Sequence, residues 1–218
     1  MLGMLLNLAS GAAPAILCLG AHSDDIEIGC GGTILQLLKA YPQAEVSWVV
    51  FSAGEERAGE AIASAGDFLA KANEKQIVLK DFRDGFFPYE GAAIKEFFEQ
   101  MKRQIEPDIV FTHFRHDLHQ DHRLLSELTW NTFRNHCILE YEIPKYDGDL
   151  GSPNVFVQLD AATCEKKIAL LQKHFVTQAS KDWFNRELFF SLLRLRGMES
   201  RAPFDYAEAF YVRKLILK

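Results

Sequence analysis

Short apolar runs alternate with helix-like segments over the first half of the chain, and this alternation restricts the fold more than any other feature. The apolar runs, expected to be buried strands, are residues 15–20, 46–51, 76–79 and 109–112. The helix-like segments between them are residues 33–40, 60–72 and 92–105. Buried strands separated by helices are typical of a parallel sheet covered on both faces. We therefore predict an α/β fold, with a Rossmann-like, mostly parallel sheet flanked by helices.

The second half of the chain is less regular. The expected strands are residues 139–143 and 155–159, and the expected helices are residues 121–137, 165–174 and 184–195. The glycine-rich sequence Gly-Cys-Gly-Gly at residues 29–32 is expected to form a tight turn ahead of the first helix. No repeat or composition shift marks a boundary, so we predict a single domain over residues 1–218.

Composition excludes several classes of protein. Hydrophobic residues make up 48% of the chain and charged residues 25%, as in globular domains and unlike disordered chains or coiled coils. The net charge of -6 has the wrong sign for non-specific nucleic-acid binding. A chain of 218 residues needs no metal merely to stay folded. Any metal site is therefore expected to be functional.

The cysteines and the N-terminal segment favour a cytoplasmic protein without a membrane span. The four cysteines lie far apart and form no CxxC pair, which argues against a disulfide framework and a cysteine zinc knuckle. They are Cys18, Cys30, Cys137 and Cys164. Residues 1–21 carry no charge, but Asn, Ser, Gly and Pro interrupt them. The first basic residue is Lys39, so the segment lacks the basic region of a secretory signal.

Five of the seven histidines lie in two short segments that each follow a predicted strand. The first segment reads His-Ser-Asp-Asp at residues 22–25, and the second holds His113, His116, His119 and His122. In open parallel α/β sheets ligands bind beyond the carboxyl ends of the strands, where such segments meet. Imidazole and carboxylate groups are ligands of catalytic zinc, commonly three with a fourth position for water. The two segments therefore predict a metal site.

Spacing supports this prediction without assigning every ligand. His22 and Asp25 are close enough in one loop to share an ion, and His119 and His122 face the same side if the second segment opens a helix. Spacing alone leaves open whether His119 binds the metal or stands beside it. An acidic pair after a strand more often caps the next helix, and the histidines could be surface residues. The coincidence of both clusters at strand ends favours the metal site.

The two segments resemble the motifs of the PIG-L/LmbE-like zinc-dependent N-deacetylases, which remove acetyl groups from N-acetylated amino sugars and their conjugates. The family's His-Pro-Asp-Asp motif is similar to residues 22–25, with Ser23 in place of proline, and its His-x-Asp-His motif is similar to residues 119–122. Weaker similarities extend over nearly the whole chain. They involve residues 52–60, 83–85 and 106–108, Lys167, His174, Gln178 and residues 206–210.

The resemblance implies a metal centre with a separate base. His22, Asp25 and His122 would hold one zinc ion, and Asp24 would be the general base. Zinc lowers the pKa of bound water from about 16 to about 7. A carboxylate beside a metal ligand, but not bound to the metal, can take the remaining proton as that water attacks an acetyl carbonyl.

The resemblance also implies groups that act on the substrate. His119 would be the electrophile and acid, with Asp121 as its orienting partner, and would stabilise the oxyanion together with the metal. Arg57 and Asp84, near predicted strand ends, are candidate contacts for substrate hydroxyls or an anionic group, although ordinary surface charge explains them equally well. The implied partner is a small-molecule N-acetylated sugar or glycoconjugate. The sequence does not fix its identity, and it leaves a homo-oligomer open.

Three other interpretations were weighed against this one. A metal-dependent phosphohydrolase would use His116 and Asp117 as the dipeptide of the His-Asp domain, but that fold is all-helical. Two histidines and one carboxylate also suit ferrous iron in oxygen chemistry, though mostly in double-stranded β-helix folds, which are unlike this chain. A non-catalytic binding module would normally close its metal site with a fourth protein ligand, whereas Asp24 is left free.

Overall fold

The protein, described here from a computed structural model over residues 13–216, contains one seven-stranded sheet. The strand order is β3-β2-β1-β4-β5-β7-β6. The strands are β1 (Ala15–His22), β2 (Glu45–Ser52), β3 (Glu74–Leu79), β4 (Ile109–His113), β5 (Cys137–Tyr141), β6 (Val155–Leu159) and β7 (Tyr206–Tyr211). Strands β1 to β5 pair in parallel, and β7 is antiparallel to both of its neighbours. The predicted mostly parallel α/β fold is confirmed.

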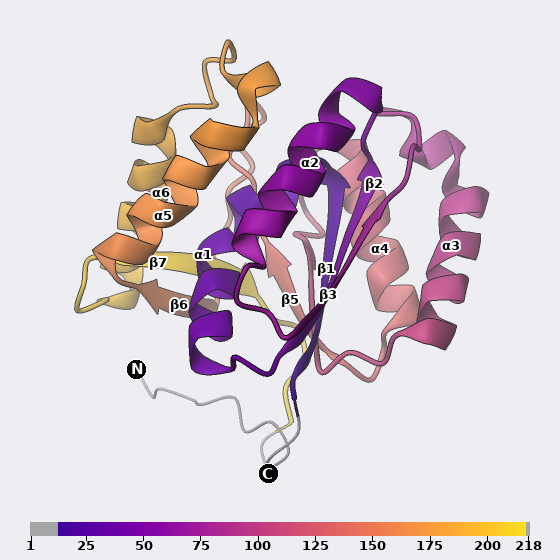
Figure 1. The fold of residues 1–218 in the computed structure, drawn as a ribbon, viewed down its shortest axis with the longest axis horizontal. Coiled ribbons are helices and arrows are strands. Elements are labelled where there is room, and N and C mark those ends of the chain that lie inside the picture. The colour runs from indigo at the N-terminus through magenta and orange to yellow at the C-terminus, as the bar shows by residue number, and fades with distance from the viewer. Residues whose placement is uncertain (1–12, 217–218) are drawn as a thin grey trace.

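Helices cover both faces of this sheet. The α-helices are α1 (Asp25–Ala40), α2 (Glu55–Phe68), α3 (Gly91–Gln104), α4 (Gln120–Thr132), α5 (Ala161–His174) and α6 (Arg186–Ser200), and the short 3₁₀ helices are η1 (Phe87–Tyr89) and η2 (Val176–Gln178). Helices α3 and α4 lie on one side of the sheet, and α1, α2 and α5 lie on the other (Figure 1). Within residues 13–216, no helix combines the length and the apolar character that crossing a bilayer requires. The uncharged residues 1–12 lie outside the described part of the chain.

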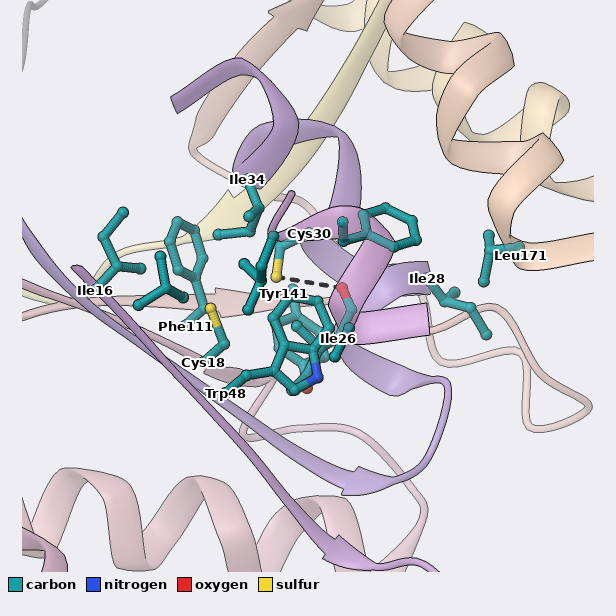
Figure 2. Close-up of a cluster of buried hydrophobic side chains, with 14 of the residues drawn as sticks. Ile16, Cys18, Ile26, Ile28, Cys30, Ile34, Trp48, Phe111, Tyr141 and Leu171 are labelled. Atoms are coloured by element: carbon teal, nitrogen blue, oxygen red, sulfur yellow. Dashed lines mark hydrogen bonds between the residues drawn. The ribbon is translucent and has the colours of Figure 1, made fainter. Parts of the chain in front are cut away.

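A hydrophobic cluster on each face holds the layers together. Successive residues of a strand point to opposite faces, so Ile16 and Cys18 of β1 join the cluster under α1, while Leu17 and Leu19 join the cluster under α3 and α4. All four are at most 2% exposed, which explains why β1 shows no polar alternation. Figure 2 shows part of the first cluster, including Tyr141 of β5.

Helix α1 begins at Asp25, earlier than predicted, and the glycines expected to form a turn lie inside it. Glycine lowers helix propensity, which is why the sequence favoured a turn. Close packing overrides that preference, because a Cβ at Gly29 would lie 2.1 Å from Cδ2 of Tyr141. Cys30, in the same stretch, donates its thiol to the carbonyl of Ile26 over 3.3 Å (Figure 2). The glycines therefore bring the helix close to the sheet.

Strand β7 was not predicted, and it lies between β5 and β6. Its sequence, Tyr-Ala-Glu-Ala-Phe-Tyr, has a glutamate in the middle, and a charged residue is rarely fully buried unless it is paired. Glu208 is only 4% exposed, and its Oε1 lies 2.6 Å from Nζ of Lys167 on α5. The ion pair with Lys167, 41 residues away in the sequence, therefore allows Glu208 to be buried in the middle of this strand.

Candidate metal centre and active site

The carboxyl ends of two adjacent parallel strands bring the histidine segments together. His22 ends β1, and Asp24 is the N-cap residue of α1, which follows directly. His113 ends β4, and His119 is the N-cap residue of α4. Because β1 and β4 pair in parallel, both segments lie at the same edge of the sheet.

Three potential ligand atoms form a compact triangle at this edge. Nδ1 of His22 lies 3.3 Å from Oδ2 of Asp25 and 3.2 Å from Nε2 of His122. The third side, from Nε2 of His122 to Oδ2 of Asp25, is 3.5 Å. Nitrogen and oxygen atoms bound to tetrahedral zinc at about 2.0–2.1 Å lie roughly 3.3–3.4 Å apart. These donor atoms therefore fit a single small divalent cation.

The ionisation states of two of these groups suit metal binding, which requires neutral imidazole and ionised carboxylate. Asp25 is 3% exposed and His122 is 2% exposed. Burial lowers the pKa of His122 to about 4, which keeps its imidazole neutral. Burial alone would raise the pKa of Asp25, but the imidazoles of His122, His113 and His22 outweigh burial and hold that pKa well below its usual range.

Three neighbouring carboxylates surround His22 and favour a positive charge on its imidazole. Burial opposes a charge on its imidazole, yet the neighbouring carboxylates of Asp25, Asp121 and Asp84 outweigh burial and raise the pKa of His22 well above its usual value. Its Nε2 lies 3.0 Å from Oδ1 of Asp84 and 3.3 Å from Oδ2 of Asp121. The excess of carboxylates favours a cation at this site.

Asp117 binds the candidate ligand His122 on the side of its ring away from the triangle. Its Oδ2 lies 2.9 Å from Nδ1 of His122 and also 2.9 Å from Nζ of Lys145, and its Oδ1 accepts the backbone N–H of His119 over 2.8 Å. A carboxylate on the far nitrogen fixes the tautomer and orientation of a metal-binding histidine. Nε2 of His122 is thereby left to face the triangle.

Asp121, predicted as the orienting partner of His119, contacts His22 with its side chain. Its carboxylate accepts the backbone N–H groups of Gly85 (2.6 Å) and Phe87 (3.1 Å), besides lying against Nε2 of His22. Toward His119 it offers only its backbone N–H, which donates to Nδ1 over 3.3 Å. The two backbone N–H groups hold the carboxylate beside His22, while His119, as N-cap residue, accepts the backbone N–H of Asp121. Asp121 is thus a partner of the candidate ligand His22.

Asp24 lies beside the triangle as a buried carboxyl group. Its Oδ1 accepts Nη2 of Arg57 over 2.6 Å, while Oδ2 has no hydrogen-bond partner within residues 13–216. Burial raises the pKa of Asp24 despite the nearby guanidinium. Arg57, predicted as a substrate contact, therefore holds one oxygen of the predicted base, and the other oxygen remains available for proton transfer.

His119 and Asp84 lie around the imidazole of His22. The His119 ring is edge-on to His22, with centroids 5.0 Å apart, and lies 4.6 Å from the ring of His122. Burial lowers the pKa of His119, so its imidazole is neutral at neutral pH. The Asp84 side chain is 67% exposed while contacting Nε2 of His22, which places a carboxylate between the buried site and solvent.

Two buried residues of the site, His113 and Asp117, had no predicted role in the deacetylase interpretation. His113 is fully buried, its ring stacks on His122 at 3.9 Å, and its Nε2 lies 3.3 Å from Oδ2 of Asp25 and 3.0 Å from the backbone nitrogen of Ala21. Membership in the histidine-rich segment was the available signal. Asp117 precedes α4 in an irregular loop, so no helical spacing predicts its contact with His122.

An α/β sheet with this histidine and aspartate cluster at the ends of β1 and β4 matches one family of proteins. The family model described as GlcNAc-PI de-N-acetylase, or PIG-L, matches residues 17–133. The chain belongs to the PIG-L family, and the resemblance inferred from the sequence is confirmed. The matched range includes both histidine segments.

Solved structures share the fold at low sequence identity. The N,N'-diacetylchitobiose deacetylase from Pyrococcus horikoshii is 22% identical, with a TM-score of 0.72 and coverage of 96% of this chain and 87% of that one. A zinc-inhibited form of the teicoplanin deacetylase Orf2 is 14% identical, with a TM-score of 0.71 and coverage of 91% and 97%. GalB, the 4-carboxy-2-hydroxymuconate hydratase from Pseudomonas putida KT2440, is 17% identical, with a TM-score of 0.72 and coverage of 94% and 98%. The sequence has no significant match among curated proteins.

Proposed function

We propose that the protein is a zinc-dependent N-deacetylase that removes the acetyl group from an N-acetylated amino sugar or its conjugate. The observation that carries this proposal is the triangle of His22, Asp25 and His122 with the buried carboxyl of Asp24 beside it. Membership in the PIG-L family supports the reaction class. A bound zinc ion would supply a Lewis acid and water activated at neutral pH.

Asp24 is the proposed general base. Because Arg57 occupies Oδ1, the oxygen that takes the proton of the attacking water is Oδ2. The raised pKa of Asp24 lets the same carboxyl return this proton to the departing amine. The amide bond breaks, acetate and free amine are the products, and no covalent intermediate with the protein is needed.

His119 is the proposed donor to the oxyanion. Its Nδ1 accepts the backbone N–H of Asp121, so in the neutral ring the proton is on Nε2. Nε2 then donates to the carbonyl oxygen as negative charge develops there. Losing such a donor typically lowers the rate about 10²–10³-fold. Asp121, through its contact with His22, would fix a metal ligand instead.

The remaining parts of the proposal concern the substrate and the whole chain. Asp84, exposed beside His22, is the proposed contact for a substrate hydroxyl, and Arg57 is a second candidate through its free guanidinium edge. We propose that residues 1–218 act as one deacetylase domain in the cytoplasm, on a small-molecule N-acetylated sugar or glycoconjugate.

Metal analysis combined with a substrate panel tests the function. The purified protein is expected to contain about one zinc per chain and to release acetate from at least one N-acetylated sugar, disaccharide or sugar conjugate. His122→Ala should lose both the metal and the activity, while His116→Ala, an exposed histidine of the same segment, should keep both. Full zinc occupancy in His122→Ala would contradict the ligand set. Hydration of an unsaturated acid without any acetate release would contradict the deacetylase.

A further inference from the structure

A buried ion pair from the C-terminal part of the chain binds helix α1 behind the metal ligands. Lys167 on α5 and Glu208 on β7 are 3% and 4% exposed. Besides its 2.6 Å contact with Glu208, Nζ of Lys167 donates to the carbonyl of Ile28 over 2.6 Å. Glu208 accepts the backbone N–H groups of Gly32 (2.8 Å) and Thr33 (2.6 Å). Both charged groups thus bind the backbone of α1 as well as each other.

These contacts involve two backbone groups of α1 that lie one helical hydrogen bond apart, the carbonyl of Ile28 and the N–H of Gly32. In an α-helix the carbonyl of residue 28 is the acceptor for the N–H of residue 32. Lys167 donates to that carbonyl and Glu208 accepts that N–H, so the ion pair contacts both groups of this step. Glycine is needed there, because a Cβ at Gly32 would lie 2.9 Å from Oε1 of Glu208.

The first turn of α1 and the rest of the helix have different structural roles. The body packs in the core through Ile34 and Leu38, which are at most 1% exposed. The first turn carries Asp25, whose Oδ2 must stay within 3.5 Å of two imidazole nitrogens. Catalytic geometry tolerates displacements of only about 0.5 Å. Lys167 and Glu208 hold the backbone of α1 directly after this first turn.

Stability alone is a weak reason for such a pair. Replacing a buried ion pair with apolar residues of similar size is often neutral or stabilising. We propose that Lys167 and Glu208 are positioning residues, which fix the first turn of α1, and with it Asp24 and Asp25, relative to His122. This inference rests on the proposed metal site and is independent of which acetylated substrate is used. Both residues lie outside residues 17–133, the range that the family model matches.

The test compares two buried ion pairs. The double variant Lys167→Met/Glu208→Gln removes both charges with little change in size. The matched control is Glu142→Gln/Arg196→Met, which removes the pair between α6 and the end of β5, where Nε of Arg196 lies 2.7 Å from Oε1 of Glu142. Measurements are the dissociation constant for Zn²⁺, the visible spectrum of the Co²⁺-loaded protein, thermal unfolding, and kcat and KM on the active member of the panel.

The Lys167/Glu208 variant is expected to bind Zn²⁺ about 10–100-fold more weakly, as when outer-shell partners of metal ligands are changed. Its Co²⁺ spectrum should shift and its kcat should fall with KM unchanged. The control variant should keep the metal affinity and the spectrum of the wild type, whatever its melting temperature. Unchanged metal affinity and spectrum in the Lys167/Glu208 variant, or equal losses in both variants, would overturn the inference.

A variant that fails to fold is also informative. Glu208→Gln alone keeps Lys167 and one oxygen acceptor, and is expected to show the same loss in milder form. Failure of both Lys167/Glu208 variants to fold, while the control folds, would assign the pair to folding and overturn the positioning role. A wild-type protein that binds no Zn²⁺ would instead contradict the proposed function itself, so the two failures are distinguishable.

Discussion

The two parts of the sheet contribute differently to the candidate site. Strands β1 to β4 and the segments that follow them supply its chemical groups, from His22 to His122. The part from β5 onward supplies charged groups that hold those groups, through Lys145 on Asp117 and through the buried Lys167 on the backbone of α1. The comparison teaches that the reactive residues come from short local motifs, whereas their fixed geometry depends on residues far away in the sequence.

The largest effect is expected from a change within the N-terminal part that spares the metal. Asp24→Asn removes the proposed base, and we expect kcat to fall about 10²–10⁴-fold because general base catalysis is lost. Zinc content should stay near that of the wild type, since Asp24 is outside the triangle. Steady-state kinetics and elemental analysis check this, with Asp81→Asn, an exposed carboxylate after β3, as control. Loss of zinc from Asp24→Asn would make it a ligand and not a base.

An intermediate effect is expected where the two parts meet. Asp117→Asn weakens the orientation of His122, and we expect zinc affinity or kcat to fall about 10–100-fold. Lys145→Met removes only the partner from the C-terminal part, so its effect should be smaller. Metal titration and kinetics on both variants check this order, with Asp147→Asn, an exposed residue near Lys145, as control. The reverse order would mean that Lys145 acts on the site by another route.

The smallest effect on activity, but a distinct effect on stability, is expected at Glu27. This residue of α1 is fully buried and, among the described residues, has no ion-pair partner, in contrast to Glu208. Burial raises the pKa of Glu27 from 4.5 to about 8. The folded state therefore holds a proton that the unfolded state has released, so the contribution to stability is full below about pH 4.5 and is lost as the pH rises toward about 8.

Glu27→Gln should remove this dependence. Relative to the variant, the wild type should lose up to about 1.4 kcal/mol of unfolding free energy per pH unit within that window. Denaturant unfolding at pH 5, 6.5 and 8 measures the difference, and Glu56→Gln, on the surface of α2, is the control. Parallel pH profiles for the wild type and Glu27→Gln would show that Glu27 ionises normally despite its burial.

The predictable part of the fold is the part with local signals. The apolar runs that became β1, β2 and β4 were identified because strands buried on both faces lack polar residues. Strand β7 was missed because Glu208 is acceptable there only through Lys167, a contact that no local pattern encodes. Helix α1 was predicted to start too late because its glycines suggested a turn. In the structure, glycine is needed at position 29 because a Cβ there would clash with Tyr141.

The candidate site likewise has one part that local sequence signals predicted and one part that they did not. The position of the two histidine segments after adjacent parallel strands was sufficient to predict that they meet, because such strands end at one edge. The family resemblance, and not spacing, selected His22, Asp25 and His122 within them. The contact of Asp121 with His22 was not predicted, because the backbone N–H groups of Gly85 and Phe87 that bind its carboxylate lie far away in the sequence. The stacking of His113 on His122 joins two residues of one segment whose fold is irregular, so it needed the three-dimensional structure.

The interior position of β7 has a consequence for the order of events during synthesis. Until the ribosome has added residues 206–211, β6 has no strand to join it to the sheet, and the growing sheet stops at β5 with an open edge. A nascent chain that already carries both histidine segments therefore still lacks Glu208. The proposed metal site should thus reach its final geometry only once residues 206–211 have been made.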